Sequence, residues 1–344
     1  MNLVLCSTGS YPRIGDSPEL QTLRRTIAGV DRGERTPADV AEAEMEMTRR
    51  ALEEQVRAGI EMLTDGQIRW YDPFSHLAGK LAGVKITGLL RFFDTNTYFR
   101  QPVVTARPER RGPMLADEFA FARQALAALA GPNGKAARLQ VKPVLTGPYT
   151  LAKFSLATHD GMRALEARAE AYAQALAAEL RALAEAGATF IQVDEPAIVK
   201  YAQDWTVFVR ALDVLVKARQ DAVKAGNRLQ LALYVYFHDC AALYEKLANL
   251  PVDVLGIDFT YNPKLAEQVS AAGSPIPLGL GLVDGRNTML ENPGTMARQI
   301  ERLLPRIAGG CAYLGTSSGL EYLPRDRAYA KLELLSKIVA LVKG

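Results

Sequence analysis

The stretch Phe190-Ile191-Gln192-Val193-Asp194-Glu195-Pro196 indicates the fold class. A short apolar run that ends in two acidic residues is typical of a buried parallel strand whose carboxyl end meets solvent. The preceding segment, 161–186, is dominated by Ala, Leu and Glu and predicts an outer helix. A helix followed by a buried strand is the repeating unit of an α/β fold.

This unit recurs along the whole chain. We count eight short β-branched or apolar runs with helical segments between them, and eight parallel strands close a (β/α)8 TIM barrel. A chain of 344 residues fits a single barrel with insertions, so we expect one domain over 1–344. The expected strands are 3–8, 60–64, 139–145, 189–194, 230–236, 252–258, 276–282 and 311–315.

One long gap separates the second expected strand from the third. It spans about 68–137 and contains the sequence from Arg91 to Arg100, which is rich in aromatic residues. Long loops in compact domains are usually functional. We therefore expect this insertion to form a hairpin or lid near the barrel mouth.

Composition excludes several classes of partner. The 41 basic and 38 acidic side chains are spread along the chain, so there is no basic face for nucleic acid. No apolar run approaches the length of about 18 residues that a membrane span needs, and the start does not resemble a signal peptide. We expect a cytoplasmic protein that binds neither membrane nor nucleic acid. The cysteines Cys6, Cys240 and Cys311 lack the paired spacing of a disulfide framework.

Polar residues follow nearly all the expected strands. Because the active sites of this barrel lie at the carboxyl ends of its strands, we expect these residues to form one site. They are Ser10, Asp65, Gln67, Asp194, Glu195, Tyr236, His238, Asp258, Asp284, Arg286, Asn287, Ser317 and Ser318.

The acidic pair Asp194 and Glu195 is the most informative of these features. Two carboxylates at the mouth could bind an ammonium group or transfer a proton. The alternative is that they cap the next helix, with Pro196 forming the turn.

His238 and Cys240 could approach one metal ion, because alternate residues of an extended segment share a face. Zinc favours histidine and cysteine ligands, and Asp258 after the next strand could supply a third. The alternative is a polar loop histidine beside a cysteine packed in the core. The sequence leaves both interpretations open.

Several segments together resemble the cobalamin-independent methionine synthases, whose polypeptide contains two related (β/α)8 barrels. The resemblance runs nearly from end to end and combines motifs of the front and rear barrels. A stand-alone barrel of this kind looks like the short, single-barrel relatives. The segments are Gly9–Gly15, Thr64–Gly66, Phe93–Asn96, Asp194–Ala197, Val283–Asn287 and Ser317–Leu320.

The resemblance implies a methyltransferase of methionine biosynthesis. The acceptor would be a small thiol, most simply homocysteine, and the methyl donor would be methyltetrahydrofolate or a methylcorrinoid such as methylcobalamin on a corrinoid protein. The rear-barrel zinc ligands fall on Tyr236, His238, Asp258 and Ser318, and only His238 and Asp258 of these remain plausible ligands. Gln67 stands where the rear barrel has a glutamate that holds the substrate amino group.

The same resemblance implies roles for individual residues. Asp194 would bind the substrate amino group and Ser10 its carboxylate, while Glu195 and Gln67 would shape the pocket. Zinc held by His238, Cys240 and Asp258 would favour the thiolate, and without zinc His238 would act as the general base. The donor side would be lined by Phe93, Asp94, Asn96 and Arg286.

A second hypothesis belongs to a different class of protein. The front-barrel motifs and the changes at the metal positions also suit a non-catalytic barrel subunit that binds folate or a corrinoid protein. Asp194, Glu195 and Asp258 favour the enzyme. Metal content and methionine formation would separate the two hypotheses.

Overall fold

The computed structural model describes residues 2–130 and 138–342 and shows an α/β fold built on parallel strands. Seven strands form one parallel sheet in the order β1-β12-β11-β10-β9-β8-β6, and β2 pairs in parallel with β5. Each expected run coincides with strands of these sheets, and the third is divided in two. The strands are β1 (Asn2–Leu5), β2 (Met62–Leu63), β5 (Gln140–Val141), β6 (Val144–Thr146), β8 (Phe190–Asp194), β9 (Gln230–Val235), β10 (Val254–Asp258), β11 (Leu278–Val283) and β12 (Cys311–Thr316).

The two sheets are connected on both sides. Ser7 N donates to Met62 O at 2.9 Å and Glu61 N donates to Leu5 O at 3.0 Å, which joins β1 to β2. On the other side, Lys142 and Pro143 separate β5 from β6, and proline has no N–H to continue a ladder. The carboxyl ends of all these strands therefore face the same end of the molecule.

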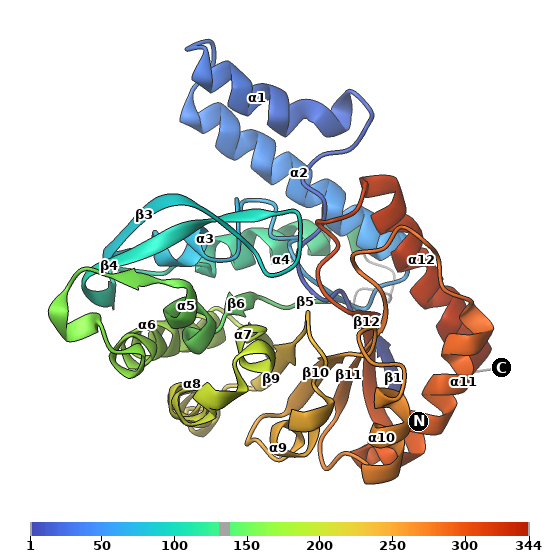
Figure 1. Cartoon of the computed structure of the whole chain (residues 1–344). Helices are drawn as coiled ribbons and strands as arrows, with labels where there is room; N and C mark the ends of the chain where they lie inside the picture. Colours follow the sequence, from blue (N-terminus) through green and yellow to red (C-terminus); the bar gives the residue numbers. More distant parts are fainter. Residues whose placement is uncertain (1, 131–137, 343–344) are drawn as a thin grey trace.

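Helices lie around the outside of the strands (Figure 1). The long helix α2 begins at a capping box, in which Thr36 and Asp39 each bond the other's backbone N–H. None of the helices in the described ranges is long and apolar enough to cross a membrane. The helices are α1 (Thr22–Asp31), α2 (Pro37–Arg57), α3 (Ser75–Ala78), α4 (Ala116–Ala130), α5 (Pro148–Phe154), α6 (Leu165–Glu185), α7 (Ala197–Lys200), α8 (Trp205–Lys224), α9 (Tyr244–Ala248), α10 (Leu265–Ala272), α11 (Pro293–Leu303) and α12 (Arg325–Val342).

The segment between β2 and β5 contains a long antiparallel hairpin, β3 (Leu81–Arg91) and β4 (Tyr98–Arg110). The short strand β7 (Leu156–Ala157) extends it by pairing with β4. At the hairpin turn, the rings of Phe92 and Phe93 lie 5.4 and 5.5 Å from the ring of Phe237, which follows β9. The hairpin turn thus contacts the carboxyl end of the main sheet. Residues 131–137, at the end of the expected insertion, lie outside the described residues.

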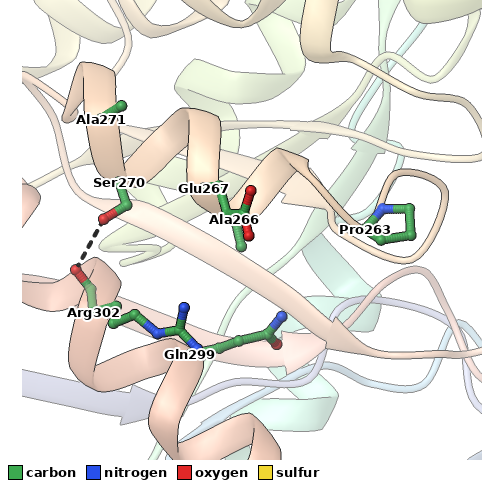
Figure 2. A pocket seen from close by; sticks show the side chains of 7 residues that line it. All are labelled: Pro263, Ala266, Glu267, Ser270, Ala271, Gln299 and Arg302. Atoms are coloured by element: carbon green, nitrogen blue, oxygen red, sulfur yellow. Dashed lines mark hydrogen bonds between the residues drawn. The ribbon is translucent and has the colours of Figure 1, made fainter.

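A cavity of about 360 Å³ lies among the outer helices, between α10 and α11 (Figure 2). It is lined by short or flexible side chains such as Ala266, Ser270 and Arg302. None of the polar residues that follow the strands lines it. This cavity is therefore separate from the strand-end residues.

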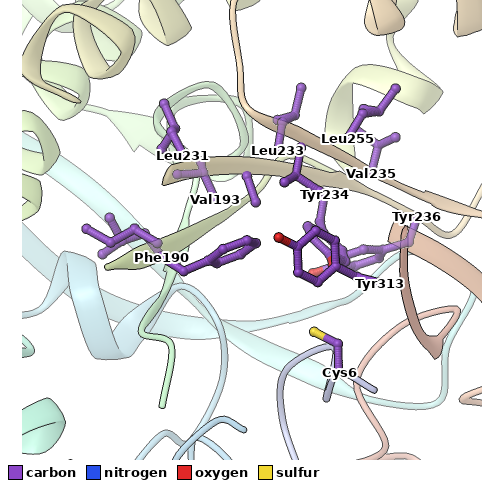
Figure 3. Close-up of a cluster of buried hydrophobic side chains, with 14 of the residues drawn as sticks. Cys6, Phe190, Val193, Leu231, Leu233, Tyr234, Val235, Tyr236, Leu255 and Tyr313 are labelled. Atoms are coloured by element: carbon purple, nitrogen blue, oxygen red, sulfur yellow. The ribbon is translucent and has the colours of Figure 1, made fainter. Parts of the chain in front are cut away.

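Aromatic rings from several strands of the main sheet lie together in the hydrophobic core (Figure 3). The rings of Phe190 and Tyr313 lie 5.3 Å apart. Tyr234 occupies the space beside Gly256 and Gly279, where a β-carbon on either glycine would overlap its ring. These glycines are needed because a large ring approaches the backbone closely. The interior beneath the strand ends is consequently a packed core.

Candidate functional site

Asp194 ends β8 and is fixed by two side chains. Gln192, on the same face of the strand, donates from Nε2 to Asp194 Oδ1 at 2.7 Å and to Thr8 O at 2.6 Å. Tyr236 OH donates to Asp194 Oδ2 at 3.0 Å. Burial raises the pKa of Asp194 to about 7, although these hydrogen bonds and the charge of Lys142 lower it. Asp194 can therefore change its charge near neutral pH.

A buried cation lies behind this carboxyl. Lys142 is 1% exposed, and its Nζ donates to Gln192 Oε1. The ammonium nitrogen also lies 4.8 Å from the centre of the Tyr234 ring, within the range of a cation–π contact. Gln192 thus connects Lys142 to Asp194. The sequence analysis did not identify Lys142 or Gln192 as site residues. A polar residue inside an apolar strand was the signal that could have identified them.

Ser10 and Gln67 meet at the ends of β1 and β2. Ser10 Oγ donates to Gln67 Oε1, and Gln67 has a left-handed backbone with φ of 50°. Asp65 Oδ1 stabilises this turn by accepting from Gln67 N at 2.9 Å. Burial, followed by the charge of Glu118, raises the pKa of Asp65 to about 6. The predicted pocket residues Ser10 and Gln67 are therefore adjacent.

Glu195 follows β8 and is bonded to the beginning of α5. It is completely buried, and its two carboxyl oxygens accept from Tyr149 N at 2.9 Å and Thr150 N at 2.7 Å. These are the first free N–H groups of α5. Burial raises the pKa of Glu195 to about 7, and the bonds to α5 lower it. Glu195 therefore caps the preceding helix α5, whereas the next helix, α7, begins at Pro196 without a side-chain cap.

His238 lies beyond β9 beside the hairpin turn. Its ring is 5.7 Å from that of Phe93 and 6.0 Å from that of Tyr261. Its Nε2 is buried and has no hydrogen-bond partner among the described residues. Burial lowers the pKa of His238, as does the charge of Lys200, while Asp94 opposes this effect. The imidazole therefore favours its neutral form, in which one ring nitrogen can accept a proton.

The expected zinc ligands His238, Cys240 and Asp258 do not come together. Phe237 has a left-handed backbone with φ of 73°, so the segment after β9 is not extended and the i, i+2 argument fails. Cys240 packs in the hydrophobic core at 1% exposure, and burial raises the pKa of its thiol to about 12. Asp258 Oδ1 accepts from Thr260 N at 2.8 Å and its Oδ2 from Phe237 N at 3.3 Å.

These contacts decide whether zinc fits. Zinc binds thiolate sulfur, imidazole nitrogen or a free carboxylate oxygen, and here the thiol is packed in the hydrophobic core while the carboxylate accepts backbone N–H bonds that stabilise a turn. Over 2–130 and 138–342, no group of three His, Cys, Asp or Glu side chains is arranged to hold a metal ion. Ser318 Oγ, at the position that resembles the final metal ligand, donates to Gly319 O at 3.2 Å. We conclude that these residues do not fit the zinc site that the sequence suggested.

The residues expected on the donor side surround the hairpin turn. Arg286 Nη1 donates to Tyr261 OH, and its guanidinium lies 5.6 Å from the centre of the Phe237 ring. Asp94 and Asn96 are exposed on the turn itself. Asp94 lies near enough to His238 to influence its pKa, so the turn and the strand ends share one polar region.

A second cavity, of about 100 Å³, lies between the hairpin and the loops after β1, β2 and β12. It is lined by Ser10 and by two charged residues that sequence reasoning missed, Arg13 and Glu321. Burial, together with the charge of Asp194, raises the pKa of Glu321 to about 7. The acidic side chain just beyond β12 was a weak signal, because many loop carboxylates are solvated.

Comparisons with known proteins agree with this architecture. Residues 79–308 match the model of the family described as cobalamin-independent synthase, N-terminal domain. Methionine synthase of Saccharolobus solfataricus is 29% identical over 332 residues, covering 96% of this chain and 92% of that protein. Methionine synthase of Thermococcus kodakarensis is 28% identical over 338 residues, covering 96% and 92%.

Solved structures show the same fold. A B12-independent methionine synthase from a Shewanella species, in complex with selenomethionine, superposes with a TM-score of 0.76 at 19% identity and covers 100% of this chain and 98% of that one. A putative vitamin-B12 independent methionine synthase from Listeria monocytogenes superposes with a TM-score of 0.71 at 15% identity and covers 99% of each chain.

Proposed function

The chain belongs to the cobalamin-independent methionine synthase family, and from this premise we propose that it is a methyltransferase that converts homocysteine to methionine. The methyl donor is methyltetrahydrofolate or a methylcorrinoid. Family membership supports the reaction, and the strand-end residues support its location. The main support for placing the reaction at the strand ends is the buried carboxyl of Asp194, which Gln192 and Tyr236 fix at the end of β8.

Asp194 binds the amino group of homocysteine in this proposal. A carboxylate that is already oriented by two donors pays little entropy when it accepts a further hydrogen bond from an ammonium group. Ser10 is the proposed partner of the substrate carboxylate, and its hydroxyl would exchange the bond to Gln67 Oε1 for one to that carboxylate. The pKa of Asp194 near 7 predicts that binding strengthens as pH rises through neutrality, because only the ionised carboxylate attracts the cation.

His238 is the proposed general base. Only a few per cent of a free thiol is ionised at neutral pH, since its pKa is about 8.5. The unpartnered Nε2 of a neutral His238 can take the thiol proton as the sulfur attacks the methyl carbon. The bond from the methyl carbon to the donor breaks, and the donor leaves with the electron pair. Asp94, Asn96 and Arg286 line the donor side.

We also infer that the eight strands close into a single barrel that spans 1–344 and that the β3–β4 hairpin acts as a lid. The backbone bonds between β1 and β2 and the chain continuity from β5 to β6 support closure. Contacts of Phe92 and Phe93 with Phe237 support a hairpin placed over the mouth.

The experiment is methionine formation by the purified protein from homocysteine, with methyltetrahydrofolate and methylcobalamin supplied separately. We expect turnover with one of the two donors. In His238→Ala the turnover should fall at least about tenfold, because general-base catalysis typically contributes about 100-fold or more. Absence of methionine with both donors would contradict the proposal and favour a non-catalytic subunit that binds folate or a corrinoid protein.

A further inference from the structure

A lysine on the outer helix α12 is completely buried and is bonded to the loop after β11. Lys331 Nζ donates to Glu291 Oε1 and Oε2, both at 2.9 Å, and to Met289 O. These contacts give a partner to every N–H group of the ammonium. Lysine is almost never fully buried unless it is paired, so its position on an outer helix needs an explanation.

Stability alone does not explain this ion pair. Moving two charges out of water costs about as much as their attraction returns, and apolar side chains of similar volume often stabilise a protein equally well. A pair of this kind does fix the geometry of the groups that it joins. The explanation should therefore be found in the loop that Glu291 and Met289 belong to.

The bonds from Lys331 continue through this loop to its beginning. Glu291 Oε1 also accepts from Asp284 N at 2.8 Å, and Asp284 Oδ1 accepts from Arg286 N at 2.8 Å. Between them, residues 287–290 are all exposed. A loop that buries few apolar side chains opens easily unless polar contacts hold it. The order of this loop therefore depends on the contacts that Lys331 and Glu291 make.

Arg286 is the residue whose position depends on this order. Its backbone N–H is held by Asp284, and its guanidinium lies 4.5 Å from the centre of the Tyr261 ring. The Arg286 side chain is partly exposed, so a ligand can reach it. In the proposed reaction the donor leaves with the electron pair, and a positive charge held beside it stabilises the negative charge that develops.

We propose that Lys331 is a positioning residue for methyl transfer, which acts through Glu291 and Asp284 to hold Arg286 beside the departing donor. The inference rests on the proposed function, which places the donor at Arg286. Lys331 lies beneath the loop and touches no substrate. Its loss should therefore affect the use of the donor and leave the binding of the acceptor side unchanged.

The experiment combines hydrogen–deuterium exchange with kinetics in Lys331→Met, which keeps an unbranched side chain and removes the cation. Exchange of the amides in 284–291 should accelerate at least about tenfold, because these residues open locally. The kcat/KM for the methyl donor should fall about tenfold or more, as expected when a charged group is misplaced. The affinity for L-methionine, measured by calorimetry, should stay within about twofold.

Two further variants separate positioning from stability. Lys337→Met changes an exposed lysine of the same helix and should alter neither exchange nor kinetics. The double variant Lys331→Met/Glu291→Gln leaves no unpaired charge, so its thermal stability should recover. Its donor kcat/KM should stay low, because nothing then holds Met289 O. The double variant also replaces the single one in every measurement if Lys331→Met does not fold.

Unchanged exchange in 284–291, or an equal acceleration along the whole chain, would overturn the inference. So would recovery of donor kcat/KM together with stability in the double variant. If the native protein transfers no methyl group from either donor, the proposed function fails, while the exchange data still decide whether Lys331 holds the loop. If the native protein is active and Lys331→Met uses the donor equally well, only this inference fails.

Discussion

The strand-end region has two halves, one near β1, β8 and β12 and the other near β9 and β10. Both contain buried acidic side chains, but the hydrogen bonding of these side chains differs. Near β1, β8 and β12, Asp194 is held at 8% exposure and Glu321 keeps a buried oxygen without a partner in the described structure. Near β9 and β10, Asp258 accepts bonds from two backbone N–H groups and Cys240 is packed in the core. Burial raises the pKa of both acids of the first half to about 7, and one oxygen of Glu321 has no partner among the described residues. The second half instead uses its acid and thiol to build the loop after β9.

This contrast teaches that residue type does not decide whether a side chain can bind a ligand. A carboxylate whose oxygens already accept backbone N–H bonds has a structural role, as Glu195 and Asp258 have. Glu321 differs, because its buried Oε2 has no hydrogen-bond partner among the described residues. Variants that separate these states test the contrast.

The largest effect should come from Asp194→Asn. We expect methyl transfer to fall about 100-fold, because the variant loses a charged hydrogen bond to the substrate and the field of the carboxylate. Measured near pH 4, where the folded carboxyl is protonated, the free energy of unfolding should change by no more than about 1 kcal/mol, since an amide can still accept from Gln192.

The pH dependence of stability provides a further check. The pKa of Asp194 is raised from its ordinary value of 3.8 to about 7 in the folded protein. Its contribution to stability is therefore complete below about pH 4 and is lost as pH rises through 7. Asp194→Asn should remove this loss, as measured by denaturant unfolding at several pH values.

The matched change Asp258→Ala should instead lower the free energy of unfolding by about 2–3 kcal/mol, because backbone donors lose their acceptor. Unchanged turnover in Asp194→Asn would remove Asp194 from the mechanism.

The sequence predicted the strands more completely than the site. Apolar runs such as Phe190–Val193 identify buried strands because burial on both faces requires them. The turn at Phe237 could not be predicted, since a left-handed φ at a bulky residue depends on tertiary contacts such as the bond from Phe237 N to Asp258. Glu321 was missed for a similar reason. Its importance depends on Gly319 and Ser10, which only the fold brings beside it.

A smaller effect should follow Lys142→Met, which tests whether the buried Lys142 controls the pKa of Asp194. The change removes the cation that, through Gln192, favours the ionised form of Asp194. We expect the pKa of Asp194 to rise above 7, so the acidic limb of the kcat/KM profile should move upward by up to about one pH unit. Activity should fall severalfold at neutral pH and recover at alkaline pH. An equal loss at every pH would indicate a purely structural role for Lys142.

The smallest effect should come from Cys240→Ala, which tests the second half. The thiol is 1% exposed, and burial, followed by the charges of Asp239 and Asp258, raises its pKa to about 12. Because no group of three metal-ligating side chains within the described residues includes this thiol, the variant should keep the metal content of the native protein and its turnover within about twofold. Loss of the sulfur leaves a small void, for which a cost of about 1 kcal/mol in the free energy of unfolding is expected. Elemental analysis of native and variant protein, purified side by side, measures the metal. Zinc present in the native protein and absent from Cys240→Ala would show that the loop after β9 rearranges to expose the thiol, and the distinction between the two halves would no longer hold.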